Sequence, residues 1–209
     1  MKKTIIFDFD GVIVNSSNIK SDAFEKLFST YGKSIGIRAK KFHIENEGIP
    51  RSQKFKYINK YIVNSKKKDN LEKLNHKYSK IILSKISNKK LSYGFKKFIK
   101  TYNQDLNLYI SSSAPLNELK YIINKKKIDK FFKIISGFPP KKIVQIRKII
   151  KDHKLAKKNI YYIGDTEHDY QMSKKLNLNF IGYIKYGNKF QNQQIKLVKN
   201  FEQIFDYIN

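Results

Sequence analysis

The stretch Ile5-Ile6-Phe7-Asp8-Phe9-Asp10-Gly11-Val12 decides how the rest of the chain is interpreted. An apolar run that ends in acidic residues and a glycine is typical of a buried strand whose carboxyl end opens into a site. Because residues two apart on a strand share a face, Asp8 and Asp10 are expected to point the same way. Two carboxylates at that spacing repel each other, so they need a cation, a shared proton or a chemical role. The simpler alternative is a strand that ends in solvated acids.

The carboxyl-terminal part of the chain alternates short apolar runs with helical patterns. Helices are predicted over 94–102, 116–125, 141–152, 167–176 and near 194–207, and strands over 106–110, 132–135, 160–163 and 180–184. Together with a first strand over 3–8, this alternation indicates an α/β fold in which a parallel sheet carries helices on both faces. Sites in such sheets lie at the carboxyl ends of the strands.

Residues 15–88 differ from the rest because they show helical periodicity and no convincing strand. Helices are predicted over 16–31, 38–48, 51–63 and 69–86. The region follows the first strand and therefore behaves like an inserted module. We expect two domains, namely an α/β core formed by 1–14 and 89–209, and a helical domain over 15–88.

Composition narrows the class of protein. The chain has 209 residues, of which 40% are hydrophobic, and this suffices for one core with a small inserted module. It has no long uninterrupted apolar segment and no cysteine, so we expect no membrane span, no disulfide and no thiolate metal site. The cytoplasm is the default location, and the sequence carries no signal for the oligomeric state.

The formal net charge of +27 by itself favours a nucleic-acid or anionic-surface partner. Among the 44 basic residues, however, only Arg38, Arg51 and Arg147 are arginines, and the lysines are spread along the whole chain. Proteins that recognise phosphates or bases generally use arginine more heavily. We interpret the charge as a solvated lysine-rich surface and expect no nucleic-acid partner, although an attraction for small anions is compatible with it.

Polar residues that suit one site follow several of the predicted strands. Asp8 and Asp10 follow the first strand, Ser112 the second, and Asp165 and Asp169 a later one. Because Mg²⁺ prefers oxygen ligands, acids on two neighbouring strand ends predict a magnesium site. A carboxylate beside a metal can act as a nucleophile, and a second carboxylate can transfer a proton.

The helix predicted over 141–152 begins with Lys141 and Lys142, either of which can hold phosphoryl oxygens together with a serine hydroxyl. Each of these residues also has a simpler explanation. Ser112 can be a helix N-cap, the two lysines can be surface residues, and Asp169 can be a first-turn acid that the helix dipole stabilises.

Two motifs are specific enough to indicate a family, namely Asp8-Phe9-Asp10-Gly11-Val12 and Gly164-Asp165-Thr166-Glu167-His168-Asp169. With a hydroxyl at the end of the second strand and a lysine between them in order, they resemble the four motifs of the haloacid dehalogenase-like hydrolase superfamily. The resemblance covers essentially the whole chain. It is to the branch that includes phosphoglycolate phosphatases and β-phosphoglucomutases.

This resemblance implies a Rossmann-like parallel sheet core with an inserted α-helical cap, a Mg²⁺ cofactor and a phosphoric monoester hydrolase activity. It implies that Asp8 is the nucleophile and a metal ligand. Asp10 is then the general acid/base and offers its backbone carbonyl to Mg²⁺. Asp165 ligates Mg²⁺, and Asp169 supports the ion directly or through water.

The resemblance also implies a phosphate-binding pair. Ser112, or alternatively Ser111, binds the transferring phosphoryl group, and Lys142 neutralises its charge. Lys142 is preferred over Lys141 because the apolar residues that follow then sit at the expected helical offsets, namely Ile146, Ile149 and Ile150.

Further residues narrow the reaction and the substrate. Asp10 favours a phosphate ester, because an alkoxide leaving group needs a proton, whereas dehalogenases lack an acid at that position. β-Phosphoglucomutases carry a histidine early in the first cap helix, and Lys20 stands at the aligned position here. Lys20 is either a surface residue or an anion-binding residue at the mouth of the site.

Gly48-Ile49-Pro50-Arg51 is the candidate specificity loop. The Arg51 fork suits a carboxylate or a second phosphate on the substrate, although a helix-cap or surface role is equally compatible. We therefore expect a Mg²⁺-dependent phosphatase that hydrolyses a small phosphorylated metabolite, either a sugar phosphate or a phosphoglycolate-like acid, through an aspartyl-phosphate. The alternatives are a phosphosugar mutase of the β-phosphoglucomutase type and a non-catalytic nucleic-acid-binding protein on the same fold.

Overall fold

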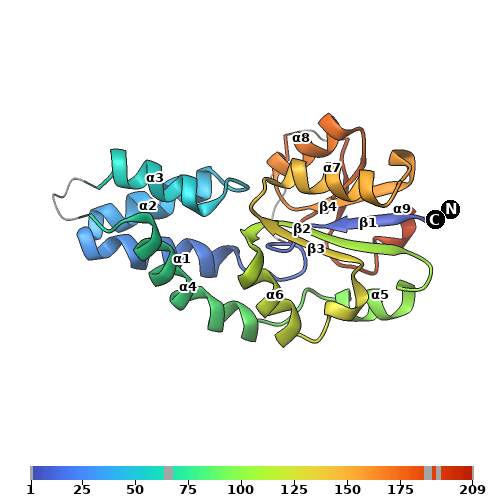
Figure 1. Cartoon of the computed structure of the whole chain (residues 1–209), viewed down its shortest axis with the longest axis horizontal. Helices are drawn as coiled ribbons and strands as arrows, with labels where there is room; N and C mark the ends of the chain where they lie inside the picture. The colour runs from blue at the N-terminus through green and yellow to red at the C-terminus, as the bar shows by residue number, and fades with distance from the viewer. Residues whose placement is uncertain (1, 64–67, 186–189, 192–193, 209) are drawn as a thin grey trace. The chain divides into compact units, whose positions relative to one another are not determined.

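The apolar run before Asp8 forms strand β1, Thr4–Phe7, and all four of its residues are buried. In the six-stranded sheet the order is β3-β2-β1-β4-β5-β6, and every pair of neighbours is parallel. The other strands are β2 (Asn107–Pro115), β3 (Ile134–Phe138), β4 (Ile160–Gly164), β5 (Asn179–Tyr183) and β6 (Lys196–Val198). This computed structural model confirms the predicted α/β fold with a parallel sheet (Figure 1).

The structure describes residues 2–63, 68–185, 190–191 and 194–208. The chain divides into two units, a core unit formed by Met1–Asn15 and Lys90–Asn209, and a helical unit formed by Ser16–Lys89. Among the helices in the described part of the chain, none combines the length and the apolar character that crossing a membrane requires.

Helices cover both faces of the sheet in the core unit (Figure 1). α7 (Lys142–Asp152) and α8 (Glu167–Leu176) lie on one face, and α5 (Phe95–Tyr102) and α6 (Leu116–Lys125) on the other. Successive side chains of β1 point to opposite faces, which explains how one strand supports both layers. Ile6 packs in a cluster with Ile146 of α7 and Met172 of α8, whereas the ring of Phe7 lies 5.7 Å from that of Phe95 on α5.

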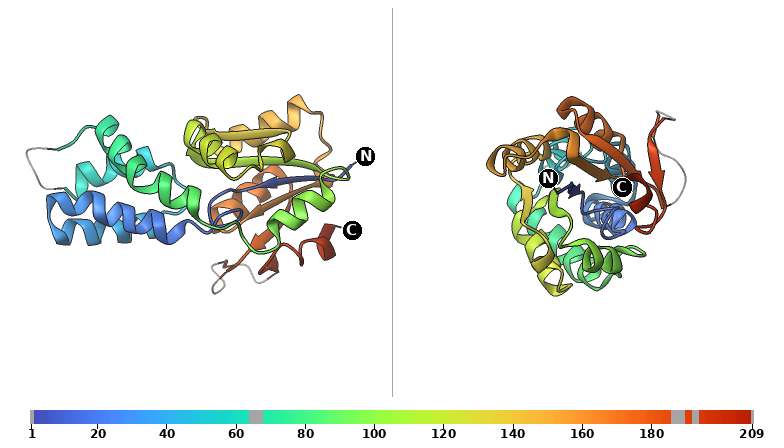
Figure 2. Two further views of the ribbon diagram at one scale, coloured as in Figure 1. Left: turned by 90° about the horizontal axis from the view of Figure 1, so that it is seen from below. Right: turned by 90° about the vertical axis from the view of Figure 1, so that its right-hand side faces the viewer.

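The predicted helix near 194–207 is wrong, because this segment forms β6 and the short helix α9, Phe205–Ile208 (Figure 2). Val198, Phe201 and Ile204 are all buried, and their spacing of three imitates a helix. β6 instead pairs with β5 at the edge of the sheet, and this pairing outweighs the local pattern. Two short 3-10 turns occur elsewhere in this unit, at Asp129–Phe131 and Lys157–Asn159.

The helical unit contains α1 (Ser17–Phe28), a 3-10 turn (Ser29–Tyr31), α2 (Lys33–Glu45), α3 (Arg51–Tyr61) and α4 (Leu71–Asn88). Its core is aromatic, with the ring of Phe24 centred 5.3 Å from Phe55 and 5.1 Å from Tyr78. α2 begins five residues before the predicted start at residue 38. It continues through Gly36, where a β-carbon would lie 2.1 Å from the hydroxyl of Ser29, so a glycine is needed for this close approach.

Candidate active site

The first part of the site is the carboxyl end of β1, which lies between β2 and β4. Asp8 follows β1 directly and is 5% exposed. Its backbone N–H donates to Ile163 O on β4 at 2.8 Å, and its Oδ1 accepts from the N–H of Phe9 at 2.7 Å. These bonds hold the Asp8 carboxylate at the junction of two strands, as expected for the edge of a parallel sheet where ligands bind.

A tight loop carries the chain from Asp8 to Asn15. Within it, Gly11 N–H donates to Val14 O at 2.8 Å, and Gly11 has a φ of 82°, in the left-handed region that favours glycine. A β-carbon on Gly11 would lie 1.8 Å from Oδ2 of Asp165, so the loop backbone lies directly against that carboxylate. Asp10, half-buried, precedes this glycine.

The second acidic pair stands at the start of α8. Thr166 is the N-cap of this helix, and its hydroxyl donates to Oδ2 of Asp169 at 2.7 Å. Asp169 is fully buried, and its Oδ1 accepts from the Tyr162 hydroxyl at 3.2 Å. Gly164 allows the first turn of α8 to pack closely against the end of β4, because a β-carbon on Gly164 would lie 2.5 Å from Cβ of Asp169. The sequence predicts a first-turn position for Asp169, but its full burial comes from the packing.

Lys142 joins the two acidic pairs. Its Nζ lies 2.7 Å from Oδ2 of Asp8 and 2.8 Å from Oδ1 of Asp169, and its side chain is 4% exposed. Lys141, one residue earlier, is exposed. Burial alone would lower the pKa of Lys142, but Asp169 and Asp8 outweigh it and hold this pKa well above the usual value. The structure thus brings one of the two candidate lysines into contact with the acids.

The two buried acids differ in their electrostatics. Burial raises the pKa of Asp8 to about 7, and Asp169 and Asp10 add to the rise while Lys142 opposes it. For Asp169, burial is outweighed by Lys142 and by the hydrogen bond from Thr166, so its pKa is lowered. Asp169 is therefore the better stabilised anion of the two, and Asp8 retains an electrostatic need for a further cation.

Three carboxylates of the site are close enough to share an ion. One oxygen each of Asp8, Asp165 and Asp169 lies within 4.8 Å of the others. The ammonium group of Lys142 is in contact with two of these three acids. The group supplies only oxygen donors and carries excess negative charge, which are the properties that a divalent magnesium or calcium ion requires.

The two candidate serines at the carboxyl end of β2 are both fully buried, and they bond differently. Ser111 donates its hydroxyl to Oε1 of Gln145 at 2.8 Å, whereas Oγ of Ser112 accepts from the N–H of Ala114 at 3.1 Å. The side chain of Ser111 therefore bonds to α7, while that of Ser112 bonds to Ala114 within β2 itself. β2 neighbours β1, so both serines lie beside the strand end that carries Asp8.

Sequence reasoning missed three supporting residues, namely Tyr162, Thr166 and Gln145. Gln145 Nε2 donates to Ser112 O at 3.1 Å and to Pro140 O at 2.6 Å. It thus ties the end of β2 to the segment that precedes Lys142. The signal that points to it is a polar residue three positions after Lys142, on the buried side of an otherwise apolar helix.

Arg51 and Lys20 belong to the helical unit. Arg51 begins α3, and its Nε and Nη2 donate to Asn75 Oδ1 at 2.9 Å and to Ser79 Oγ at 3.1 Å. The guanidinium carbon also lies 5.1 Å from the ring centroid of Tyr78. Lys20 is half-buried on α1. The roles predicted for these two residues in substrate selection stay predictions.

Comparisons with known sequences and structures identify proteins that are similar to this chain. Residues 5–183 match the sequence profile of the family described as haloacid dehalogenase-like hydrolase. A search of curated protein sequences found no match.

Solved structures with the same fold span nearly the whole chain. One is described as a predicted phosphoglycolate phosphatase from Haemophilus somnus, with 17% identity, a TM-score of 0.78, and coverage of 100% of this chain and 98% of the other. β-Phosphoglucomutase from Clostridium difficile has 20% identity, a TM-score of 0.77, and coverage of 100% and 96%. CbbY from Rhodobacter sphaeroides, solved with phosphate, has 12% identity, a TM-score of 0.77, and coverage of 98% and 96%.

These structural likenesses establish a shared fold, and the profile match, which spans more than half of the chain, establishes the family. The chain therefore belongs to the haloacid dehalogenase-like hydrolase family.

Proposed function

We propose that this protein is a Mg²⁺-dependent phosphatase that hydrolyses a small phosphorylated metabolite through an aspartyl-phosphate on Asp8. The observation that carries the proposal is the contact of Lys142 with Asp8 and Asp169, at 2.7 and 2.8 Å, beside the carboxylate of Asp165. The family and the fold neighbours support it, since these neighbours include a protein described as a predicted phosphoglycolate phosphatase and a protein solved with phosphate.

The side chains of Asp8, Asp165 and Asp169 would hold the metal, together with the backbone carbonyl of Asp10. Asp169 already accepts hydrogen bonds from Thr166 and Tyr162, so a bridging water suits its contribution. When bound, Mg²⁺ supplies positive charge that offsets the acids and the phosphoryl oxygens.

In the first step, an oxygen of Asp8 attacks phosphorus, the bond to the leaving oxygen breaks, and Asp10 donates a proton to that oxygen. In the second step, Asp10 takes a proton from water, and this water attacks the phosphorus of the aspartyl-phosphate. The bond between phosphorus and Asp8 breaks, which restores the carboxylate of Asp8 and releases inorganic phosphate. The ammonium group of Lys142 favours the ionised form of Asp8, which the attack requires.

Lys142 and Ser112 would bind the transferring phosphoryl group. Ser112 is preferred over Ser111 because the Ser111 hydroxyl donates to Gln145. The buried, braced position of Lys142 limits its motion, which suits a group that must stabilise charge as it develops.

The helical unit would act as the cap, so that the core domain of 1–14 and 89–209 carries the chemistry and the domain of 15–88 selects the substrate. Arg51 suits a carboxylate or second phosphate, and Lys20 offers a further positive charge. A sugar phosphate or a phosphoglycolate-like acid is therefore the proposed substrate class, and the cytoplasm stays the proposed location.

Phosphate release from a panel of phosphorylated sugars and acids, with Mg²⁺ and with a chelator, tests the proposal. Asp8→Asn should abolish Mg²⁺-dependent release without unfolding the protein, because it keeps the shape of the side chain and removes its charge. Asp105→Asn, at an exposed site of the core unit, is the matched control and should keep the parent rate.

Two results would overturn the assignment. If Asp8→Asn released phosphate at the parent rate, Asp8 would be excluded as the nucleophile. If the protein converted a hexose 1-phosphate to its 6-phosphate without net phosphate release, it would be a mutase. Salt-sensitive binding of DNA or RNA with no phosphate release on any substrate would instead favour the nucleic-acid-binding alternative.

A further inference from the structure

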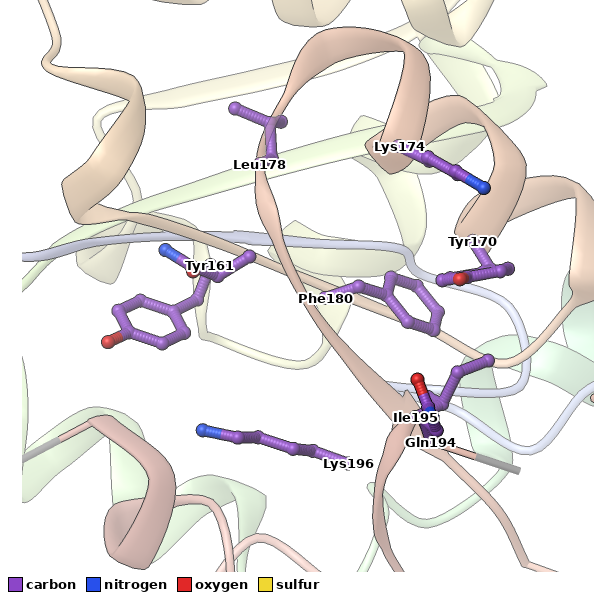
Figure 3. A pocket seen from close by; sticks show the side chains of 9 residues that line it. Tyr161, Tyr170, Lys174, Leu178, Phe180, Gln194, Ile195 and Lys196 are labelled. Atoms are coloured by element: carbon purple, nitrogen blue, oxygen red, sulfur yellow. The ribbon is translucent and has the colours of Figure 1, made fainter. Parts of the chain in front are cut away.

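The core unit has a pocket that the proposed chemistry does not use. It has a volume of about 360 Å³ and lies among β4, β5, β6 and α8 (Figure 3). Tyr161 is the second residue of β4, whereas Asp165 follows the last residue of that strand. The pocket therefore lies beside the amino-terminal half of β4, whereas the carboxyl end of this strand carries Asp165.

Aromatic rings form much of the wall of this pocket. Figure 3 shows Phe180 in the middle, with Tyr170 beside it and Tyr161 on its other side. The rings of Phe180 and Tyr170 are centred 5.5 Å apart with planes inclined at 58°, and Leu178 adds an apolar surface. All three rings are half-buried, so each keeps part of its surface available to a partner.

The rim of the pocket is positively charged. Lys174 of α8 and Lys196 of β6 line it on opposite sides of Phe180, and both are exposed (Figure 3). Lys196 Nζ also lies 5.3 Å from the ring centroid of Tyr207, which places this lysine near a further aromatic surface. The lining residues that the structure describes include these two lysines and no acid.

We propose that this pocket binds a planar aromatic ring that carries an anionic group. Offset or edge-on contact with Phe180 and the two tyrosines would bury the ring, and Lys174 and Lys196 would attract the anion. The volume lies in the range of small-molecule sites, which combine apolar walls with a few polar groups. Nucleotides and aryl acids share this chemistry.

Calorimetric titration with naphthalene-2-sulfonate and with cyclic AMP tests the proposal and separates the two sources. Cyclic AMP is a phosphodiester, so it is not a substrate of a monoesterase. Methanesulfonate supplies the anion without a ring, and naphthalene-2-methanol supplies the ring without a charge. Saturating inorganic phosphate in every titration keeps the ligands away from the proposed phosphoryl site at Lys142 and Ser112. We expect at least one aromatic anion to bind more tightly than either partial ligand.

The double substitution Lys174→Glu with Lys196→Glu should weaken that binding about tenfold, because it reverses two surface charges. Lys175→Glu, exposed on the same helix but outside the lining, is the matched control and should bind as the parent does. Tyr170→Ala should also weaken binding, and a circular dichroism spectrum checks that this variant is folded.

Three outcomes would overturn the proposal. They are failure of both aromatic anions to bind, equal affinity for the aromatic anion and for methanesulfonate, and equal weakening by Lys175→Glu and by the double substitution. None of them bears on phosphate release, so this inference and the proposed function fail independently.

Discussion

Gly11 and Asp165 are in such close contact that a β-carbon at Gly11 would lie 1.8 Å from Oδ2 of Asp165. Gly11 also has a φ of 82°, which other residues adopt only with strain. The glycine of the first motif therefore does two things at once. It turns the chain sharply after Asp10, and it leaves room for the carboxylate of Asp165, which is distant in the sequence.

Gly11→Ala should consequently lower phosphate release by about 100-fold or more, because the added methyl group displaces Asp165 or the loop that carries Asp10. Gly94→Ala is the matched control, since Gly94 also has a positive φ of 77° but lies at the start of α5. Both variants should lose about 1–2 kcal/mol of unfolding free energy. Equal activity in the two variants would show that the contact between Gly11 and Asp165 is unimportant for the reaction.

Lys142→Met should reduce activity by about 100-fold or more, because it removes the positive charge between Asp8 and Asp169. It should also lower the unfolding free energy by about 3 kcal/mol at neutral pH, since it leaves two buried acids without their shared partner. Lys141→Met changes an exposed neighbour and should alter neither quantity measurably. A larger loss of activity in Lys141→Met would reverse the assignment of the two lysines.

The choice between these two lysines illustrates what the sequence can predict. Apolar spacing along 141–152 places Lys142 on the inner side of the helix, because the period of 3.6 residues relates it to Ile146 and Ile149. Strand ends, helix starts and glycine positions are likewise local patterns. These local patterns were sufficient to predict a parallel sheet and to predict that Asp8, Asp165 and Asp169 lie together at the carboxyl ends of its strands.

Features that depend on distant partners could not be predicted in the same way. β6 exists because the edge of β5 offers backbone hydrogen bonds, and the apolar spacing of 198–204 gives no hint of that. Gln145 acquires its function only when the end of β2 and Pro140 lie on either side of it. The burial of Lys54 in the helical unit is a third example, since nothing in the stretch Gln53-Lys54-Phe55-Lys56 distinguishes this lysine from its exposed neighbour Lys56.

Asp165→Asn should weaken the stabilisation of the protein by Mg²⁺. An ion that binds the folded chain alone raises the unfolding midpoint as its concentration increases. The parent protein should therefore show a rising midpoint in a Mg²⁺ titration, and Asp165→Asn a much smaller rise. When a chelator has removed Mg²⁺, Asp165→Asn should be at least as stable as the parent, because the substitution removes one of three clustered negative charges. Asp105→Asn should match the parent throughout, and a Mg²⁺ response unchanged in Asp165→Asn would exclude this residue as a ligand.

Arg51→Ala should raise KM for the substrate that the panel identifies far more than for a generic aryl phosphate. The guanidinium is suited to a second anionic group, which an aryl phosphate lacks. Because Arg51 also donates to Asn75 and Ser79, some loss of stability should accompany the change. Asn75→Ala removes one of these bonds but keeps the charge, so it controls for that loss. If Arg51→Ala raised KM equally for both substrates, a role of Arg51 in substrate selection would be excluded.

Lys54 gives the helical unit a predictable dependence of stability on pH. Its side chain is 3% exposed, and its Nζ lies 3.0 Å from Nδ1 and 3.2 Å from O of His43. Burial, with a smaller effect of Lys20, lowers the pKa of Lys54 to about 7, although Glu47 opposes the shift. Burial also lowers the pKa of His43 to about 2, so this histidine is neutral and its ring nitrogen can accept a hydrogen bond from the lysine.

The sign of the effect follows from proton binding. Between pH 7 and about 10.5, the unfolded chain holds a proton on Lys54 that the folded chain has released, so stability should rise with pH across this window. Lys54→Met should remove this contribution to the rise of stability with pH. It should also increase the unfolding free energy at pH 7 by about 2 kcal/mol, a net value that includes the loss of the hydrogen bonds of Lys54. Lys56→Met, exposed on the same helix, should leave the pH dependence unchanged. Denaturant unfolding at several pH values measures both quantities, and an unaltered slope in Lys54→Met would show that Lys54 keeps its proton in the folded protein.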